Sequence, residues 1–265
     1  MISVNGEVIK INHFPDGSLL LKPVIPELSE PQITIDWRFE SVEEEVVLRY
    51  VTRHLQRLGY KNIKLYMPYI PNARMDRVKN DDDVFTLKYF AEDINSLGFS
   101  SVKVLDPHSN VSEALINNLE IIRPYPYIKR AIERIGESDN LMAFYPDEGA
   151  MKRYCEELKM PYTFGIKYRY FKTGEILSFD LHGDLAQMKG KDFLIVDDIS
   201  SKGTTFYFAA EALKKHGANK VYLYVTHCEN TILKGKIPDC GLIEKVFTTD
   251  SIYTANSDMV EVFKL

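Results

Sequence analysis

Two adjacent carboxylates followed by a short loop of small hydroxyl residues are the part of this sequence best suited to chemistry. Residues 193–205 read FLIVDDISSKGTT, in which four apolar residues precede Asp197 and Asp198. The loop composition suits phosphate binding, because the first N–H groups of a following helix are unpaired and glycine allows close backbone approach. The two carboxylates would then face sugar hydroxyls or a divalent cation. The alternative is that Asp198 or Ser200 merely caps the helix.

Composition bounds the class of protein. The chain has 265 residues, of which 45% are hydrophobic and 27% charged, and this indicates a soluble globular protein of one large or two smaller domains. A net charge of -5 argues against a nucleic-acid-binding surface. The three cysteines lack CxxC spacing, so neither a disulfide framework nor a zinc site is expected. The start is unlike a signal peptide and no apolar run reaches membrane-span length, so we expect a cytoplasmic protein without a membrane partner.

Strands and helices alternate along the chain, and their positions predict the fold class. Apolar runs predict strands at 63–67, 102–105, 141–145, 162–166, 193–196 and 221–225. Helical spacing predicts helices within 41–59, opened by a Ser41–Glu44 capping box, and at 87–97, 149–158 and 206–216. Such alternation implies an α/β fold with mostly parallel sheets flanked by helices. Two prolines interrupt the pattern within 121–127, so we predict domains at 1–124 and 125–265.

One segment, residues 167–183, stands apart from this alternation. It alternates polar and apolar residues around a turn signal at Thr173 and Gly174, and it is longer than most connections. We interpret it as a hairpin flap over a site, with a plain surface hairpin as the alternative.

Several short motifs occur in an order that resembles the ribose-phosphate diphosphokinase family. They are HFPDG, MPYIPNARMDR, LDPHS, YPDEGA, IKYRY, the VDD loop and YVTH, and together they cover nearly the whole chain from about residue 10. The resemblance implies two phosphoribosyltransferase-like domains. It also implies transfer of the β,γ-diphosphoryl group of MgATP to the 1-hydroxyl of ribose 5-phosphate, with release of AMP. Only the second domain would hold the pentose.

The same resemblance assigns roles to individual positions. It implies that Lys167 and Arg169 are the catalytic cations and that His108 and Asp147 hold Mg²⁺. It implies ATP binding by Phe14, Asp16, Arg74, Asp76, Arg77 and His108, and pentose binding by Asp197, Asp198, Ser200, Ser201, Lys202, Gly203, Thr204 and Thr205. The segment with Phe14 and Asp16 would frame adenine from a neighbouring subunit, which implies a homo-oligomer, a dimer or a hexamer built from dimers. Without the resemblance, Asp147 is interpreted as a helix N-cap and the arginines as surface charge.

The pentose loop departs from the family pattern, and this opens an alternative acceptor. The family has aspartate-threonine-glycine-glycine-threonine where this chain has SKGTT at 201–205. The loop is therefore more positive by about two charges, which would favour an additional anionic group. A 5-substituted ribose such as ADP-ribose is thus an alternative to ribose 5-phosphate. A phosphoribosyltransferase or a silent regulatory homologue is less favoured, because neither needs the lysine and arginine pair of the flap.

Overall fold

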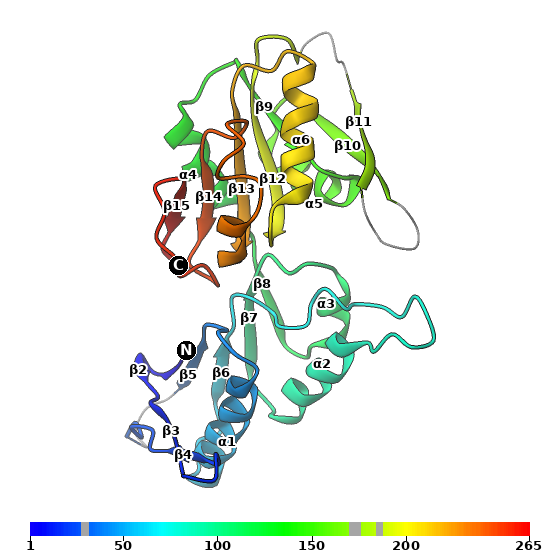
Figure 1. The fold of residues 1–265 in the computed structure, drawn as a ribbon. Helices are drawn as coiled ribbons and strands as arrows, with labels where there is room; N and C mark the ends of the chain where they lie inside the picture. Colours follow the sequence, from blue (N-terminus) through cyan, green and yellow to red (C-terminus); the bar gives the residue numbers. More distant parts are fainter. Residues whose placement is uncertain (28–31, 170–175, 184–187) are drawn as a thin grey trace. The chain divides into compact units, whose positions relative to one another are not determined.

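A computed structural model of the protein describes residues 1–27, 32–169, 176–183 and 188–265. The chain forms two compact units, Met1–Arg123 (unit 1) and Pro124–Leu265 (unit 2), and each is described by itself (Figure 1). None of the described helices is long and apolar enough to cross a membrane.

Unit 1 is built on a six-stranded sheet with helices packed against it (Figure 1). In sheet order the strands are β2 (Glu7–Val8), β1 (Ile2–Val4), β5 (Ile33–Trp37), β6 (Ile63–Tyr66), β7 (Ser101–Leu105) and β8 (Leu119–Ile122). The helices are α1 (Glu43–Arg57), α2 (Thr86–Ser96) and α3 (Val111–Leu115), and a separate hairpin is formed by β3 (Ile11–His13) and β4 (Leu19–Leu21). From β5 to β8 the strands are parallel, whereas β1 pairs antiparallel with both of its neighbours.

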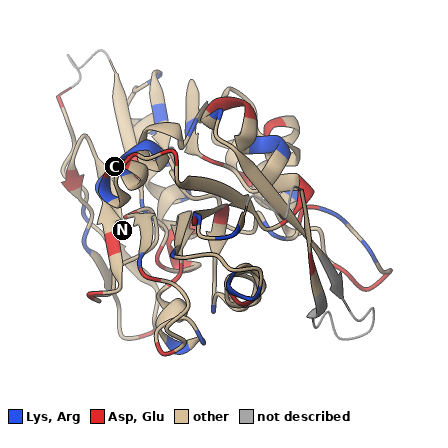
Figure 2. Ribbon diagram, turned by 90° about the horizontal axis from the view of Figure 1, so that it is seen from above, with Lys and Arg blue, Asp and Glu red and all other residues tan. Residues whose placement is uncertain are grey.

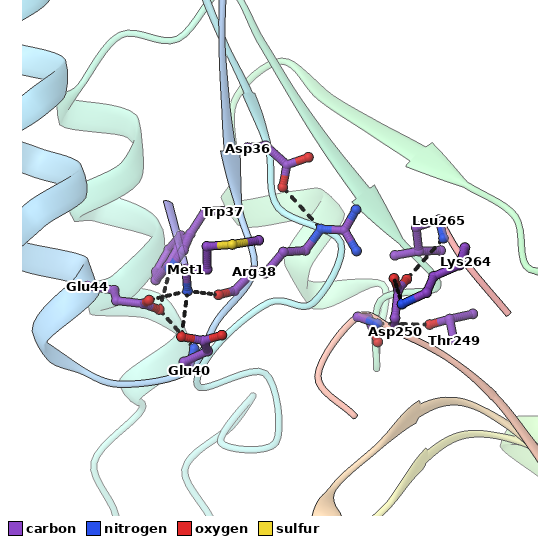
Figure 3. A network of polar contacts seen from close by, with 11 residues as sticks. Met1, Asp36, Trp37, Arg38, Glu40, Glu44, Thr249, Asp250, Lys264 and Leu265 are labelled. Atoms are coloured by element: carbon purple, nitrogen blue, oxygen red, sulfur yellow. Dashed lines mark hydrogen bonds and ion pairs between the residues drawn. The ribbon is translucent and has the colours of Figure 1, made fainter. Parts of the chain in front are cut away.

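The start of α1 differs from the predicted capping box. No side chain caps this helix, which begins at Glu43 after Val42. Glu44 is instead 3% exposed, and its carboxylate accepts hydrogen bonds from the Trp37 indole N–H at 3.0 Å and the Glu40 N–H at 2.8 Å. It also pairs with the amino group of Met1 (Figure 3). Because these buried contacts hold the Glu44 carboxylate, its hydrogen bond from the Ser41 N–H is long, at 3.5 Å, and the predicted capping box is not complete.

Unit 2 is a seven-stranded sheet that is parallel except at one edge. In sheet order the strands are β11 (Ile176–His182), β10 (Tyr162–Arg169), β9 (Leu141–Tyr145), β12 (Asp192–Ser200), β13 (Val221–Cys228), β14 (Val246–Thr249) and β15 (Val260–Phe263). The helices are α4 (Tyr125–Ile135), α5 (Glu148–Leu158) and α6 (Thr204–Lys215), with a 3₁₀ helix η2 (Asn230–Lys234). Only β11 is antiparallel to its neighbour. The predicted α/β fold class is confirmed.

The core of unit 2 alternates along β12, as a strand buried on both faces requires. Phe193 and Ile195 pack with α6, while Leu194 and Val196 pack with residues of α4 and α5. Helices therefore cover both faces of this sheet, as Figure 1 shows. Since consecutive residues point to opposite faces, this alternation fixes which helix each following residue can reach.

One predicted strand end is wrong, and two prolines have a role that the sequence pattern did not indicate. The strand predicted at 193–196 continues to Ser200, because β12 keeps pairing with β13 from Asp197 opposite Val225 to Ser200 opposite Cys228. The prolines within 121–127 start a helix and do not merely interrupt the pattern. Pro124 is the N-cap of α4 and Pro126 lies in its first turn, where a missing N–H costs no hydrogen bond.

The predicted hairpin over 167–183 is present and begins earlier than expected. Strands β10 and β11 pair antiparallel from Phe164 opposite His182 to Arg169 opposite Ile176. The turn predicted at Thr173 and Gly174 lies outside the described residues.

Candidate active site

Strand register brings several of the predicted residues of unit 2 to one edge of the sheet. The pairing of β9 with β12 ends at Phe144 opposite Ile195, and its pairing with β10 ends at Phe164. Asp147 follows the carboxyl end of β9, while Asp197 on β12 and Lys167 on β10 lie beyond the last residue of each strand that pairs with β9. Ligands of open α/β sheets bind at this edge.

The loop between β12 and α6 forms the centre of this edge. Gly203 is the residue before α6 and has a left-handed backbone with φ of 73°. A Cβ added at this position would also lie 2.3 Å from Ile237 Cδ1, so that side chain would have to move, but the left-handed backbone is the stronger reason for glycine. No described side chain caps α6, and the N–H groups of its first turn are thus suited to binding an anion. The alternative that Asp198 or Ser200 caps this helix is therefore not realised.

The side chains of this loop differ in exposure. Lys202 and Thr204 are exposed, and Thr205 is half-buried. Ser200 is 1% exposed and donates to the Ser201 carbonyl at 3.2 Å. The half-buried Ser201 donates its hydroxyl hydrogen bond to Glu229 at 2.8 Å. Glu229 was missed by sequence reasoning, which offered no signal that an acid so far along the chain meets this loop.

The two adjacent carboxylates do not point the same way. Because residues alternate along β12, Asp197 lies on the α6 face and Asp198 on the face of α5. Asp198 is 4% exposed, and its Oδ1 lies 3.4 Å from Nη1 of Arg153 on α5. Asp197 Oδ1 accepts from the Asp198 N–H at 3.0 Å. One carboxylate of the pair is thus held in an ion pair within the unit.

Asp147 has the local role predicted from the residues alone. It is the N-cap of α5, and its Oδ1 accepts a hydrogen bond from the Ala150 N–H at 3.0 Å. A capping aspartate at the carboxyl end of β9 also places a carboxylate at the edge described above. Of Lys167 and Arg169 only the backbone is described, opposite Phe179 and Ile176 on β11.

The predicted ATP-binding residues lie in unit 1. Arg74, Asp76 and Arg77 follow β6, and His108 follows the neighbouring parallel strand β7, so both groups leave the same edge of this sheet. Arg77 has a 70% exposed side chain, with Nε 3.4 Å from Oδ1 of the largely buried Asp76. Charged groups of both signs are interspersed along the ribbon (Figure 2).

Phe14 and Asp16 lie in the turn of the β3–β4 hairpin, also in unit 1. Phe14 is 49% exposed. Asp16 accepts hydrogen bonds from the Ser18 hydroxyl at 2.6 Å and the Ser18 N–H at 2.9 Å, and these bonds lower the pKa of the Asp16 carboxyl. Next to them, His13 Nε2 lies 2.6 Å from Glu43 Oε1.

Comparison with known proteins relates the chain to one group of enzymes. Residues 151–250 match the family model of the phosphoribosyl transferase domain. The ribose-phosphate pyrophosphokinase of Saccharolobus solfataricus is 27% identical over 220 residues, 81% of this chain and 74% of that protein. That of Sulfolobus acidocaldarius is 28% identical over 259 residues, 93% of this chain and 86% of that protein. Over most of its length the chain is similar to ribose-phosphate pyrophosphokinases.

A solved structure supports the same relationship at the level of the fold. The phosphoribosylpyrophosphate synthetase of Mycobacterium smegmatis matches with a TM-score of 0.77 and 19% identity, covering 97% of this chain and 86% of that one. The predicted resemblance to a diphosphokinase-like transferase is confirmed by these relatives. The roles of individual residues remain predictions.

Proposed function

We propose that the protein transfers the β,γ-diphosphoryl group of MgATP to the 1-hydroxyl of ribose 5-phosphate, forming phosphoribosyl diphosphate and AMP. The observation that carries the proposal is the loop at 201–203. It enters α6 through a left-handed Gly203 at the carboxyl edge of unit 2, inside the stretch that matches the phosphoribosyl transferase domain. Relatives named ribose-phosphate pyrophosphokinase across most of the chain support this reaction over others.

The acceptor would bind through its two ends. The 5-phosphate meets the uncapped N-terminus of α6 and the hydroxyls of Thr204 and Thr205, where N–H groups and the helix dipole favour an anion. Asp197, on the same face of β12 as α6, accepts hydrogen bonds from the ribose 2- and 3-hydroxyls. Asp198 faces the other side of β12 in an ion pair with Arg153, so the contact with the diol is assigned to Asp197 alone.

The chemical step is a displacement at phosphorus. The pentose 1-hydroxyl oxygen attacks the β-phosphorus of ATP in line, the bond from that phosphorus to the α,β-bridging oxygen breaks, and AMP leaves. Charge accumulates on the transferred group and on AMP, so cations that approach them lower the barrier. Lys167 and Arg169 supply those cations from the β10–β11 hairpin. Exclusion of water by the hairpin limits hydrolysis of ATP.

The donors fit a magnesium ion that arrives with ATP. No cluster of three or more histidine, cysteine, aspartate or glutamate side chains that could hold a metal occurs in the described part of the chain. Mg²⁺ commonly uses one or two carboxylates and completes its coordination with phosphate oxygens and water. The resemblance names Asp147 and His108 as the candidate protein ligands, and Asp147 would supply a carboxylate at the edge of the unit 2 sheet. When bound, Mg²⁺ neutralises charge on the ATP phosphates.

The remaining residues of unit 1 would bind ATP. Arg74 and Arg77 bind phosphate oxygens, for which the planar guanidinium is well shaped, and Asp76 orients Arg77. Phe14 and Asp16 frame adenine in the site of a neighbouring subunit. The active protein is therefore a homo-oligomer, a dimer or a hexamer built from dimers.

A ribose with a larger 5-substituent, such as ADP-ribose, is the second candidate acceptor, and one observation favours it. The segment with Lys234 and Lys236 packs against the loop at 201–203, because a Cβ added at Gly235 would lie 1.9 Å from the Lys202 carbonyl oxygen. Lys236 Nζ lies 4.8 Å from the ring centre of Tyr207 on α6. Lysines and an aromatic ring beside the loop suit a second phosphate.

An acceptor panel tests the proposal. The purified protein is incubated with MgATP and ribose 5-phosphate, ADP-ribose or unphosphorylated ribose, and AMP release is measured together with product mass. We expect AMP and a gain of one diphosphoryl group only with a phosphorylated acceptor. Product from ADP-ribose alone would select the second candidate. AMP release from none of them would contradict the proposal, and consumption of phosphoribosyl diphosphate with a base would indicate a phosphoribosyltransferase.

A further inference from the structure

Residues 229–237, which we call the bracing segment, pack against residues 200–203, which we call the phosphate loop. The Glu229 N–H donates to the Ser200 carbonyl at 2.8 Å, so the segment begins directly beside the loop. Further along, Gly235 lies against the backbone of Lys202, where a Cβ would come within 1.9 Å of the carbonyl oxygen. The backbone of the loop is therefore packed against this segment at two separated points.

The side chains of the bracing segment complete the contact. Ile237 packs over Gly203, since a Cβ added to that glycine would lie 2.3 Å from Ile237 Cδ1. Glu229 Oε2 accepts hydrogen bonds from the Ser201 hydroxyl at 2.8 Å and the Thr231 hydroxyl at 2.9 Å. The two hydroxyl oxygens lie 3.2 Å apart. One carboxylate thus ties the loop to the segment, and it does so with hydrogen bonds to a charged acceptor, which are the stronger kind.

We infer that Glu229 is a positioning residue for the acceptor: its carboxylate fixes Ser201, and through it the loop conformation that presents the N-terminus of α6. This inference rests on the proposed function. A loop held before the acceptor arrives loses less conformational freedom on binding, so its effect falls on acceptor affinity and not on the chemical step. Glu229 does not touch the reacting atoms in this account.

The position of Glu229 also corrects the charge expected from the sequence. Substitution of serine for the family's aspartate at position 201 suggested a loop without an acid. The structure places the Glu229 carboxylate 2.8 Å from the Ser201 hydroxyl, so an acid is supplied to the same place from another part of the chain. The loop is consequently less positive than its own residues imply.

Three variants test the inference: E229A, E229Q and S201A. Initial rates of AMP formation are measured while the acceptor and MgATP are varied separately, and ribose 5-phosphate binding is measured by titration calorimetry. We expect E229A to raise the KM and Kd for the acceptor about tenfold, the effect of losing charged hydrogen bonds, with kcat and the KM for ATP within about twofold of wild type. E229Q keeps a carbonyl acceptor and should recover part of the loss. S201A removes the same hydrogen bond. The loss of acceptor affinity in the double variant E229A/S201A should therefore be smaller than the sum of the two single losses.

The matched control is E211A on α6, which removes a glutamate whose carboxylate pairs with Lys215 at 3.2 Å. It should change neither KM, and thermal unfolding of every variant checks that the fold is retained. Unchanged acceptor KM and Kd in E229A, a fall in kcat alone, or no recovery in E229Q would overturn the inference. A wild-type protein that binds ribose 5-phosphate without releasing AMP would contradict the proposed function, while the Kd series still tests Glu229. A wild type that neither binds nor turns over would overturn both.

Discussion

Both units connect a parallel strand to a helix beyond the carboxyl end of the sheet, but the two connections are built differently. In unit 2, residues 201–203 link β12 to α6 and are held by the bracing segment through the Glu229 carboxylate. In unit 1, residues 67–85 link β6 to α2 and expose charged side chains, with Arg77 70% exposed. The first connection is held by contacts within its own unit. The second presents exposed side chains, whose binding to a ligand would cost more conformational entropy.

The largest single effect is expected at Lys167, on strand β10 of the hairpin in unit 2. Lys167→Ala should lower kcat by about 10²- to 10³-fold, because it removes a cation that stabilises charge formed in the transition state. The kcat is measured from initial rates of AMP formation. Lys152→Ala is the control, since Lys152 is an exposed lysine whose Nζ lies 2.7 Å from Glu148 Oε1, and it should retain nearly full activity. A kcat for Lys167→Ala near that of the control would remove Lys167 from the mechanism.

The bracing of the loop can be broken by one methyl group. Gly235→Ala would place a Cβ 1.9 Å from the Lys202 carbonyl oxygen, although the backbone of Gly235 has an ordinary φ of -93°. The loop must shift, which we expect to raise the acceptor KM about tenfold and to cost roughly 1–3 kcal/mol of stability. The KM for ATP should stay unchanged. Both KM values and the unfolding midpoint are measured.

Gly241→Ala is the matched control for this clash. Gly241 has φ of 62° and nothing within 4 Å of an added Cβ, so its substitution strains the backbone without touching the loop. It should lower the unfolding midpoint and leave the acceptor KM alone. Equal KM changes in the two variants would mean that the bracing segment does not set the loop.

Sequence patterns predicted those elements whose signal is local. The strand at 141–145 coincides with β9, and the helix at 149–158 begins one residue late relative to α5, because a run of buried apolar residues and a capping aspartate are readable within a few positions. Helix α4 was not predicted, because the prolines near 124 were interpreted only as an interruption, whereas proline is compatible with the first turn of a helix. The continuation of β12 through two aspartates depends on pairing with β13, which no local pattern reveals.

In the candidate site, too, the features with a local signal were predicted and those that depend on distant residues were not. Gly203 and its loop were readable from composition, because a glycine before a helix and clustered hydroxyls have a local physical meaning. The partner of Ser201 could not be predicted from composition. Glu229 lies 28 residues away, and it reaches the loop only because β13 pairs with β12. Equally, adjacency of Asp197 and Asp198 suggested one shared task, whereas strand alternation sends them to opposite faces and gives Asp198 an arginine partner.

The exposed connection of unit 1 should respond less strongly than the braced loop. Arg74→Ala and Arg77→Ala are each expected to raise the KM for ATP about fivefold, since contacts of an exposed arginine are partly screened by solvent. The acceptor KM should not change. Lys79→Ala, in the same exposed stretch, is the control for simple loss of charge. If all three variants raise the KM for ATP equally, the arginines act only through their general positive charge. If the acceptor KM rises instead, the assignment of ATP binding to unit 1 is wrong.

The smallest expected effect lies away from both connections, on the facing sides of α1 and α2. Glu45 and Asp93 line a cavity of about 120 Å³ together with Trp37 and Phe90. Burial raises the pKa of the Glu45 carboxyl, and the charge of Asp93 raises it further. A raised pKa means that folding favours the protonated form, so stability from this group is present at low pH and is lost as the pH rises through the folded pKa.

Replacing this carboxyl by an amide should therefore stabilise unit 1 in a pH-dependent way. Glu45→Gln should raise the free energy of unfolding at pH 7 by about 0.5 kcal/mol, a small gain because the group is partly exposed, and should have little effect near pH 4. Glu120→Gln is the control of opposite sign, since a hydrogen bond from the Ser101 hydroxyl lowers the pKa of Glu120 and its loss should destabilise at pH 7. Thermal unfolding midpoints at the two pH values measure both. Parallel shifts of the two variants would show that removal of a negative charge, and not the local environment of each carboxyl, governs the stability of this unit.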